Sequence, residues 1–182
     1  MPNAIEMLRE DHKKVQELFQ QFEQADEGAR KQIAEQTIQE LEVHAALEEE
    51  IFYPAAREEV DKEQTIDQAL EEHHVAKLLL AELKKMSLGA ERYDAKYKVL
   101  AESVKHHIEE EESEMFPSLA GRLDVEEVGE QMETRKPKLQ EKFSTGSGTR
   151  RSKSKSRAKT TARQRKKQSS GKKRRRASGG RR

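Results

Sequence analysis

Residues 44–54 read His-Ala-Ala-Leu-Glu-Glu-Glu-Ile-Phe-Tyr-Pro, and residues 107–117 read His-Ile-Glu-Glu-Glu-Glu-Ser-Glu-Met-Phe-Pro. Both stretches follow one pattern: a histidine, three residues, two glutamates, three residues, an aromatic residue and a proline. Residues four apart on a helix lie on the same face, about one turn from each other. Each histidine can therefore act together with the glutamate four residues after it.

The repeat extends toward the N-terminus of each stretch. His12 is followed by apolar residues at positions 15, 18, 19 and 22, and His73 by apolar residues at positions 76, 79, 80 and 83. These two histidines are 61 residues apart, and the histidines that open the longer stretches are 63 residues apart. We interpret the pattern as a tandem repeat of a helical hairpin. Such a repeat would place two equivalent half-sites face to face across a pseudo-twofold axis.

Four segments show the spacing of three and four residues that is typical of one face of a helix. Their stripes are Ile5, Leu8, His12, Val15, Leu18 and Phe22; Ile33, Thr37, Leu41, His44, Glu48 and Ile51; Ile66, Leu70, His73, Ala76, Leu80 and Leu83; and Tyr93, Tyr97, Leu100, Val104, His107 and Glu111. Short breaks near residues 26–28, 60–62 and 87–89 separate them, and short connections imply antiparallel neighbours. The sequence therefore predicts an all-α protein, an up-and-down antiparallel four-helix bundle.

The composition agrees with this class, because 39% of the residues are charged and only 4% are aromatic. A chain of 182 residues with 32% hydrophobic residues can bury one modest core. We expect that core in residues 1–143. This part includes a short extra helix from Val125 to Phe143, which we expect Pro137 to break.

Residues 144–182 are of a different kind, with 17 lysines and arginines and no acidic residue. Residues 1–143 consequently hold 19 basic and 35 acidic residues, a net charge of −16. The last segment has too few apolar residues to build a core, so we expect a disordered tail. It could be a solubilising extension or could contact the acidic bundle. The sequence favours a third role, an arm for DNA or RNA through residues 150–182.

The chain has no cysteine, so any metal must be held by nitrogen and oxygen ligands. The N-terminus lacks the basic start and the apolar run of a secretory signal. The sequence contains no long uncharged stretch that could span a bilayer. We therefore expect a cytoplasmic protein without membrane contact.

Each stripe contains groups that an apolar core does not tolerate without a partner. A metal centre would satisfy all of them at once. The predicted metal ligands are His12, His44, Glu48, His73, His107 and Glu111. Because each carboxylate has two oxygens and can bridge while the imidazoles bind at the ends, this set suits two closely spaced metal ions. With an oxo or hydroxo bridge from solvent, about two of roughly twelve octahedral positions would stay open for a small ligand.

Other residues of the motifs have simpler interpretations. His74 and His106 lie one residue off the stripes, which indicates surface positions or indirect support of the centre. The remaining glutamates are typical of a solvated helix face, although the last of them could still act as a ligand: Glu49, Glu50, Glu109, Glu110 and Glu112. The aromatic residues and the prolines after them are expected to pack and to end the helices: Tyr53, Pro54, Phe116 and Pro117.

The stripe histidines and glutamates, with Asp11 ahead of His12 and the aromatic-proline endings, resemble the hemerythrin-like HHE cation-binding domain. The resemblance covers roughly residues 3–120. It implies an up-and-down bundle in which the two carboxylates bridge two iron ions, a non-haem di-iron centre. Members of the family bind dioxygen, sense oxygen or iron, or handle reactive small molecules.

Two positions differ from the oxygen-carrying hemerythrins. The carriers have a further histidine where this chain has Lys77, and their last carboxylate is an aspartate five residues after its histidine, not a glutamate four after. The missing imidazole should open a position on the second iron, which disfavours simple oxygen transport. We therefore expect a protein that binds or senses dioxygen, peroxide or nitric oxide. The alternatives are an iron store and an iron-dependent enzyme that decomposes peroxide or reduces dioxygen.

Two other metal centres fit the residues less well. A ferritin-like carboxylate centre needs a pair of Glu-x-x-His motifs, and only Glu71 with His74 has this spacing at a ligand-bearing position. Tetrahedral zinc takes fewer ligands than the six predicted here.

Overall fold

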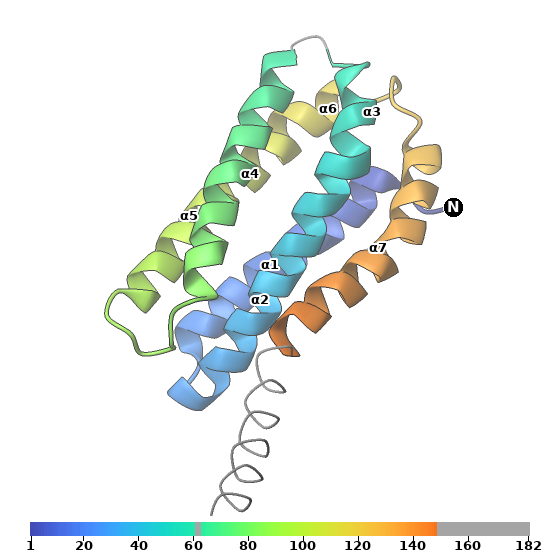
Figure 1. The fold of residues 1–182 in the computed structure, drawn as a ribbon. Coiled ribbons are helices and arrows are strands. Elements are labelled where there is room, and N and C mark those ends of the chain that lie inside the picture. The colour runs from blue at the N-terminus through green and yellow to red at the C-terminus, as the bar shows by residue number, and fades with distance from the viewer. Residues whose placement is uncertain (61–62, 149–182) are drawn as a thin grey trace, which may run out of the picture. The chain divides into compact units, whose positions relative to one another are not determined.

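We describe residues 1–60 and 63–148 from a computed structural model of the chain. Every regular element within these residues is helical, which confirms the predicted all-α class. Four long helices form the antiparallel up-and-down bundle (Figure 1). They are α1 (Ala4–Gln24), α2 (Glu27–Leu47), α4 (Glu63–Leu83) and α5 (Tyr93–Glu110). The disordered tail was predicted for residues 144–182. Residues 144–148 are helical instead, and residues 149–182 lie outside the described residues.

Capping side chains begin the first two helices. The Asn3 side chain accepts a hydrogen bond from the backbone N–H of Glu6 at 3.1 Å. In the same way, the Asp26 side chain accepts one from the backbone N–H of Ala29 at 2.9 Å. Each bond satisfies a backbone donor that the first helical turn leaves free. The cap at Asp26 follows so soon after the end of α1 that α1 and α2 must lie side by side.

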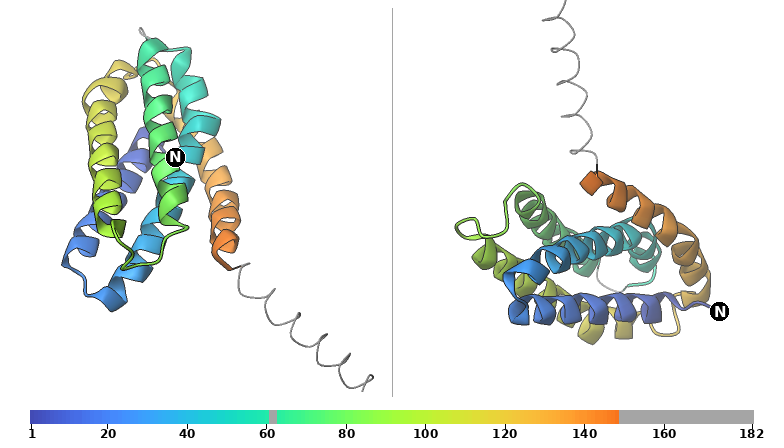
Figure 2. Two further views of the ribbon diagram at one scale, coloured as in Figure 1. Left: turned by 60° about the vertical axis from the view of Figure 1, so that its left-hand side comes forward. Right: turned by 90° about the horizontal axis from the view of Figure 1, so that it is seen from below.

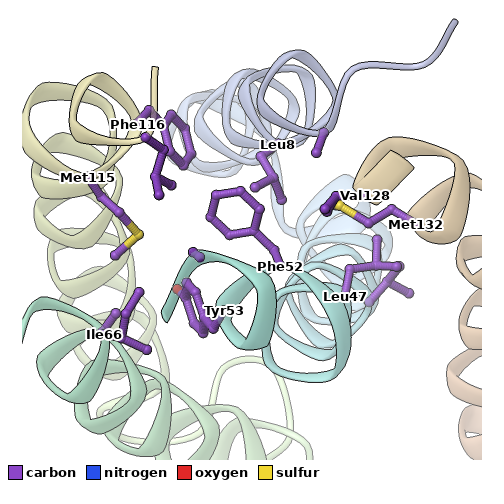
Figure 3. Close-up of a cluster of buried hydrophobic side chains, with 14 of the residues drawn as sticks. Leu8, Leu47, Phe52, Tyr53, Ile66, Met115, Phe116, Val128 and Met132 are labelled. Atoms are coloured by element: carbon purple, nitrogen blue, oxygen red, sulfur yellow. The ribbon is translucent and has the colours of Figure 1, made fainter. Parts of the chain in front are cut away.

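Two apolar clusters fill the bundle, and a polar layer separates them. Along α1, Leu8 belongs to the first cluster and Val15 to the second, with His12 between them. Along α4, Ala69 and Leu80 flank His73 in the same way. Figure 3 shows the first cluster, in which side chains from several helices surround one another: Leu8, Leu47, Phe52, Ile66, Met115 and Phe116. The predicted stripes therefore face a common core.

Both repeated motifs pass through a wider turn. The π-helical turns η1 (Glu48–Phe52) and η2 (Glu111–Met115) lead into the short helices α3 (Tyr53–Arg57) and α6 (Phe116–Ser118). The backbone N–H of Tyr53 donates to the carbonyl of Glu48, five residues back, and that of Phe116 donates to Glu111. A proline follows each turn. Because a proline ring would clash with the carbonyl four residues back in a regular α-helix, the wider turn accommodates it.

A fifth long helix, α7 (Val125–Gly148), lies along the bundle next to α2 (Figures 1 and 2). The expectation that Pro137 would break this helix is wrong, and the helix ends at Gly148, not at Phe143. Pro137 removes one backbone donor, but both Pro137 and Glu133, four residues earlier, are exposed. Water can therefore solvate the carbonyl that loses its donor.

Apolar residues of α7 dock it against the bundle. Val128 and Met132 belong to the first cluster and lie beside Leu47 (Figure 3). At Gly129 the helix approaches the N-terminal segment so closely that a Cβ atom would lie 2.3 Å from the carbonyl oxygen of Pro2. A side chain at this position would push the helix away. The packed unit of the chain runs from Met1 to Phe143.

Within residues 1–60 and 63–148, no helix has the length and apolar character needed to cross a membrane.

Candidate metal centre

The polar layer of the bundle contains all six predicted ligands. Helices α1, α2, α4 and α5 each contribute one histidine, and η1 and η2 each begin with one glutamate. None of the six is more than 6% exposed: His12, His44, Glu48, His73, His107 and Glu111. The two halves of the sequence repeat therefore meet at the middle of the molecule.

Each glutamate connects histidines from both halves of the chain. Glu48 Oε2 lies 3.1 Å from His44 Nε2 and 3.2 Å from His73 Nε2. Glu111 Oε2 lies 3.2 Å from His12 Nε2 and 3.5 Å from His107 Nε2. The ligand atoms form two groups that could each hold a metal ion, and Glu48 belongs to both groups. The groups are His12, His44, Glu48 and Glu111, and Glu48, His73 and His107.

Several buried atoms of this layer lack a hydrogen-bond partner within the described residues. They are His12 Nε2, His44 Nδ1, His44 Nε2, Glu48 Oε1, Glu48 Oε2 and Glu111 Oε2. Some of these atoms lie close to one another but are not aligned for hydrogen bonding. Buried polar atoms without partners are costly, and a metal ion is the partner that nitrogens and carboxylate oxygens can share. The donor set therefore fits a bound metal centre.

Carboxylates outside this layer orient three of the four imidazoles. His12 Nδ1 lies 2.8 Å from Glu112 Oε1, and His73 Nδ1 lies 2.9 Å from Glu49 Oε1. His107 Nδ1 lies 2.7 Å from Glu72 Oε2. Such partners fix which ring nitrogen faces a metal and make that nitrogen a stronger donor. For the fourth imidazole, that of His44, the described part of the chain provides no carboxylate at hydrogen-bond distance from Nδ1.

The outer carboxylates correct the sequence interpretation of two residues. Glu49 and Glu112 were expected on a solvated face, but both contact an imidazole and are only 26% and 35% exposed. Their position directly after the ligand glutamates could have suggested this contact. Glu72 was not predicted at all. Its partner His107 lies on the neighbouring helix, and no spacing within the chain reveals such a pair.

Lys77 and the two further histidines lie outside the ligand layer. Lys77 stands at the position where the oxygen carriers have a histidine. Its side chain forms an ion pair with Glu49 and is 48% exposed, so it does not act as a ligand in place of that histidine. His74 is exposed. His106 is 65% exposed and lies 3.3 Å from Glu110. The expectation of surface positions for both histidines agrees with these exposures.

Tyr53 reaches the centre, although the sequence indicated only a packing role. Its hydroxyl donates to Glu111 Oε1 at 2.9 Å and lies 3.2 Å from His73 Nε2 and 3.4 Å from His107 Nε2. Tyr53 follows Glu48 by five residues, and the π-helical turn places residues five apart on one face. Only the wider turn, which the sequence analysis did not predict, explains this placement.

The second motif has Phe116 at the equivalent position. Its ring stacks on His12 with the centroids 5.9 Å apart and an angle of 6° between the planes. A phenyl ring offers no hydroxyl, so the two halves of the centre differ. The half that contains His73 and His107 has a buried proton donor, and the half that contains His12 and His44 has an apolar wall.

Charges within the layer shift the proton affinity of its groups. Burial alone would lower the pKa of His12, but contact with Glu111 and the charges of Glu111 and Glu48 raise it to about 9. Burial opposes ionisation of His73 in the same way, and contact with Glu48 and Glu49 raises its pKa to about 9. Burial and the two ligand carboxylates raise the pKa of the Tyr53 hydroxyl well above its usual value. Tyr53 is therefore a neutral hydrogen-bond donor.

Comparison with known families agrees with this geometry. Residues 3–119 match the model of the hemerythrin HHE cation binding domain. The chain belongs to this family. A crystal structure of a hemerythrin HHE cation binding domain-containing protein from Mycobacterium kansasii is similar, with a TM-score of 0.68 and 25% sequence identity. The match covers 78% of the present HHE-domain chain and 90% of the mycobacterial chain.

A second protein similar to this chain is described by an activity and not by its domain. A protein of Nostoc sp. (strain PCC 7120 / SAG 25.82 / UTEX 2576) described as a DNA nickase is 29% identical over 156 residues. The match covers 80% of the present chain but only 43% of the Nostoc protein, so the chain spans less than half of the length of that relative. The match with the Nostoc protein covers 80% of the chain, which is longer than the segment up to residue 119 where the family domain ends. The similarity therefore includes residues after 119.

The outer carboxylates lead to a first prediction. Replacing Glu72 by glutamine removes the carboxylate that accepts from His107 Nδ1, so we expect metal affinity to fall by roughly 10- to 100-fold. Glu71→Gln is the matched control, because Glu71 precedes it in the chain and is exposed. Competition with a chelator of known affinity measures the change. Equal metal affinity of the two variants would contradict a role for Glu72 in the centre.

Proposed function

We propose that the centre holds two iron ions and binds a small ligand such as dioxygen, peroxide or nitric oxide. The main support is the set of buried imidazole and carboxylate atoms that lack partners and gather around Glu48. Membership of a cation-binding family supports the same conclusion. Two groups of ligand atoms that share one carboxylate suit a pair of ions better than a single ion.

The ligand types support iron. The described cluster offers four imidazoles and two carboxylates, and the chain has no cysteine. Imidazole and carboxylate ligands suit iron, whose six-coordinate geometry leaves positions open for a small ligand, whereas these donors would fill two tetrahedral zinc ions. Iron would supply redox chemistry and a binding position for dioxygen or a related ligand.

A small cavity lies beside the ligand layer. Its volume is about 30 Å³, which is enough to hold a water molecule. The four ligand histidines line one part of it, and apolar residues line another: Val15, Leu41, Ala76, Leu80, Val104 and Ile108. A diatomic or similarly small molecule fits such a space.

The residues around the cavity would act on a bound ligand in two ways. The outer carboxylates hold the imidazoles in fixed orientations, and the apolar part of the lining would reduce the contact of a bound ligand with water. Tyr53 keeps its proton and donates a hydrogen bond to Glu111 Oε1. The same hydroxyl hydrogen would turn from Glu111 to a ligand bound between His73 and His107.

Spectroscopy of the iron-loaded protein tests this function. We expect two iron ions per chain and absorption spectra that differ between anaerobic and aerobic samples. Recovery of the first spectrum after removal of oxygen would indicate reversible binding. Continuous turnover of added peroxide would indicate an enzyme instead. Iron-supplemented protein that carries no stoichiometric metal would reject the proposal.

We propose a second function, the binding of nucleic acid by residues 150–182. This segment is rich in lysine and arginine and contains no acidic residue, so it can contact phosphates. A relative that the chain matches over 43% of its length is described as a DNA nickase, which agrees with contact between this chain and DNA. Contacts with phosphates carry no sequence information, so we expect binding without base specificity.

Removal of residues 144–182 tests the second function. We expect the shortened protein to lose affinity for a DNA duplex at low salt and to keep its iron, because the six predicted ligands lie within residues 12–111. For the full chain, affinity should fall steeply as salt is added. Electrophoretic mobility shifts and iron analysis of the same samples give both results. Undiminished DNA binding by the shortened protein would show that the tail is not the interface.

A further inference from the structure

The fourth imidazole of the centre differs from the other three. The Nδ1 atoms of His12, His73 and His107 each have a carboxylate at hydrogen-bond distance. The carboxylate nearest to His44 Nδ1 is that of Asp11, at 4.0 Å. This separation is too long for a hydrogen bond. His44 is thus the ligand histidine whose outer nitrogen lacks a bonded acceptor.

Lys136 of α7 binds the carboxylate of Asp11, the group that could otherwise accept a hydrogen bond from His44 Nδ1. The ammonium group of Lys136 donates to both oxygens of Asp11, at 2.6 and 2.8 Å. Asp11 is only 8% exposed, so its charge needs a partner within the protein. Two cationic or potentially cationic side chains lie near the Asp11 carboxylate, Lys136 at 2.6 Å and His44 at 4.0 Å.

We propose that Lys136 competes with His44 for Asp11, so that α7 sets the strength of the fourth imidazole–carboxylate pair. With Lys136 in place, Asp11 stays on the ammonium group. Without it, the buried carboxylate turns to the nearest donor, the Nδ1–H of His44. Lys136 is therefore a positioning residue that acts on a predicted ligand through Asp11. The consequence for the metal rests on the proposed di-iron function.

The other contacts of α7 make this competition testable without undocking the helix. Arg135 forms a two-bond ion pair with Glu50 of η1, at 2.7 and 3.2 Å. Val128 and Met132 pack in the first apolar cluster. Loss of the Lys136 contact alone should therefore leave α7 in place, and the variant should fold.

The direct test is the position of Asp11 in crystals of metal-free Lys136→Met. We expect an Asp11 oxygen within hydrogen-bond distance of His44 Nδ1, and a changed ¹⁵N shift of this nitrogen in solution. The shifts of His73 and His107 should not move. Lys138→Met is the control, because Lys138 is an exposed lysine on the same helix. An Asp11 carboxylate that stays 4 Å from His44, or that turns to solvent, overturns the proposal.

Reduction potentials of the iron-loaded protein provide a second test. A bonded carboxylate makes His44 a stronger donor, which favours the ferric state. We expect Lys136→Met to lower the potential, Asp11→Asn to raise it, and Lys136→Arg to restore it. Arg135→Met removes a charge from the same turn of α7 and should have little effect. Equal shifts in Lys136→Met and Arg135→Met would mean that charge alone acts, which rejects the competition.

The two proposals fail in different ways. Wild-type protein that binds no iron rejects the di-iron function, but the crystals of the metal-free variant still test the competition. If the wild type binds two iron ions but Asp11 does not approach His44 in Lys136→Met, only the competition is rejected. If Lys136→Met were to misfold, Lys136→Ala would replace it, because alanine offers Asp11 no donor and adds little apolar surface at this partly exposed position.

Discussion

Replacing Glu48 by alanine should remove both metal ions from the protein. Its carboxylate belongs to both groups of ligand atoms and lies between His44 and His73. Without it each group keeps at most three ligands, and the two ions lose the carboxylate that joins them. We expect iron-supplemented Glu48→Ala to retain less than a tenth of the iron of the wild type after desalting, roughly the loss of one strong ligand.

The control for this variant is Glu109→Ala, because Glu109 is an exposed glutamate on α5. It should retain all of its iron. Circular dichroism of both variants would show whether the helices remain intact. A folded Glu48→Ala protein that still holds two iron ions would place the metal elsewhere, and the proposed centre would have to be abandoned.

The metal-free protein should lose stability as the pH rises from 6.5 to 9. The pKa of both His12 and His73 is raised from 6.5 to about 9 in the folded chain. A raised histidine pKa stabilises the fold fully below the unfolded value of 6.5, and this contribution is lost as the pH passes through the folded value. The shift corresponds to about 3 kcal/mol for each histidine, less for both together because they share carboxylates.

Thermal unfolding of the metal-free protein measures this loss. We expect the midpoint to fall by on the order of 10 °C over this range. In the iron-loaded protein the same nitrogens would bind metal and carry no proton, so the midpoint should stay nearly constant. His73→Gln should reduce the dependence, and the exposed neighbour variant His74→Gln should keep it. A midpoint of the metal-free protein that is flat or that rises would contradict the charged, hydrogen-bonded state of these histidines.

The sequence predicts the bundle and the ligand layer because both depend on regular helical spacing. The stripe that contains Tyr97, Val104 and His107 repeats every three or four residues, and its members are buried as expected. The alignment of the two motifs indicates two equivalent hairpins. The sequence therefore also predicts that the two half-sites face each other.

The parts that the sequence does not predict depend on contacts between helices or on irregular backbone. Glu72 of α4 contacts His107 of the neighbouring helix α5. Lys136 of α7 contacts Asp11 of α1, which lies far from it along the chain. Neither pair has a periodic signal. The general rule that proline ends a helix also fails at Pro137, because exposure to water compensates for the missing donor.

The π-helical turns affect how this chain should be aligned with others. Each wide turn holds one more residue than an α-helical turn needs, so it amounts to a one-residue insertion. A related helix that continues as a regular α-helix would need a one-residue gap within 48–52 to match. Aligned without the gap, every later residue is displaced by about 100° around the helix axis. The residue equivalent to Tyr53 would then be overlooked, so a tyrosine five residues after the glutamate identifies the relatives that share the hydroxyl.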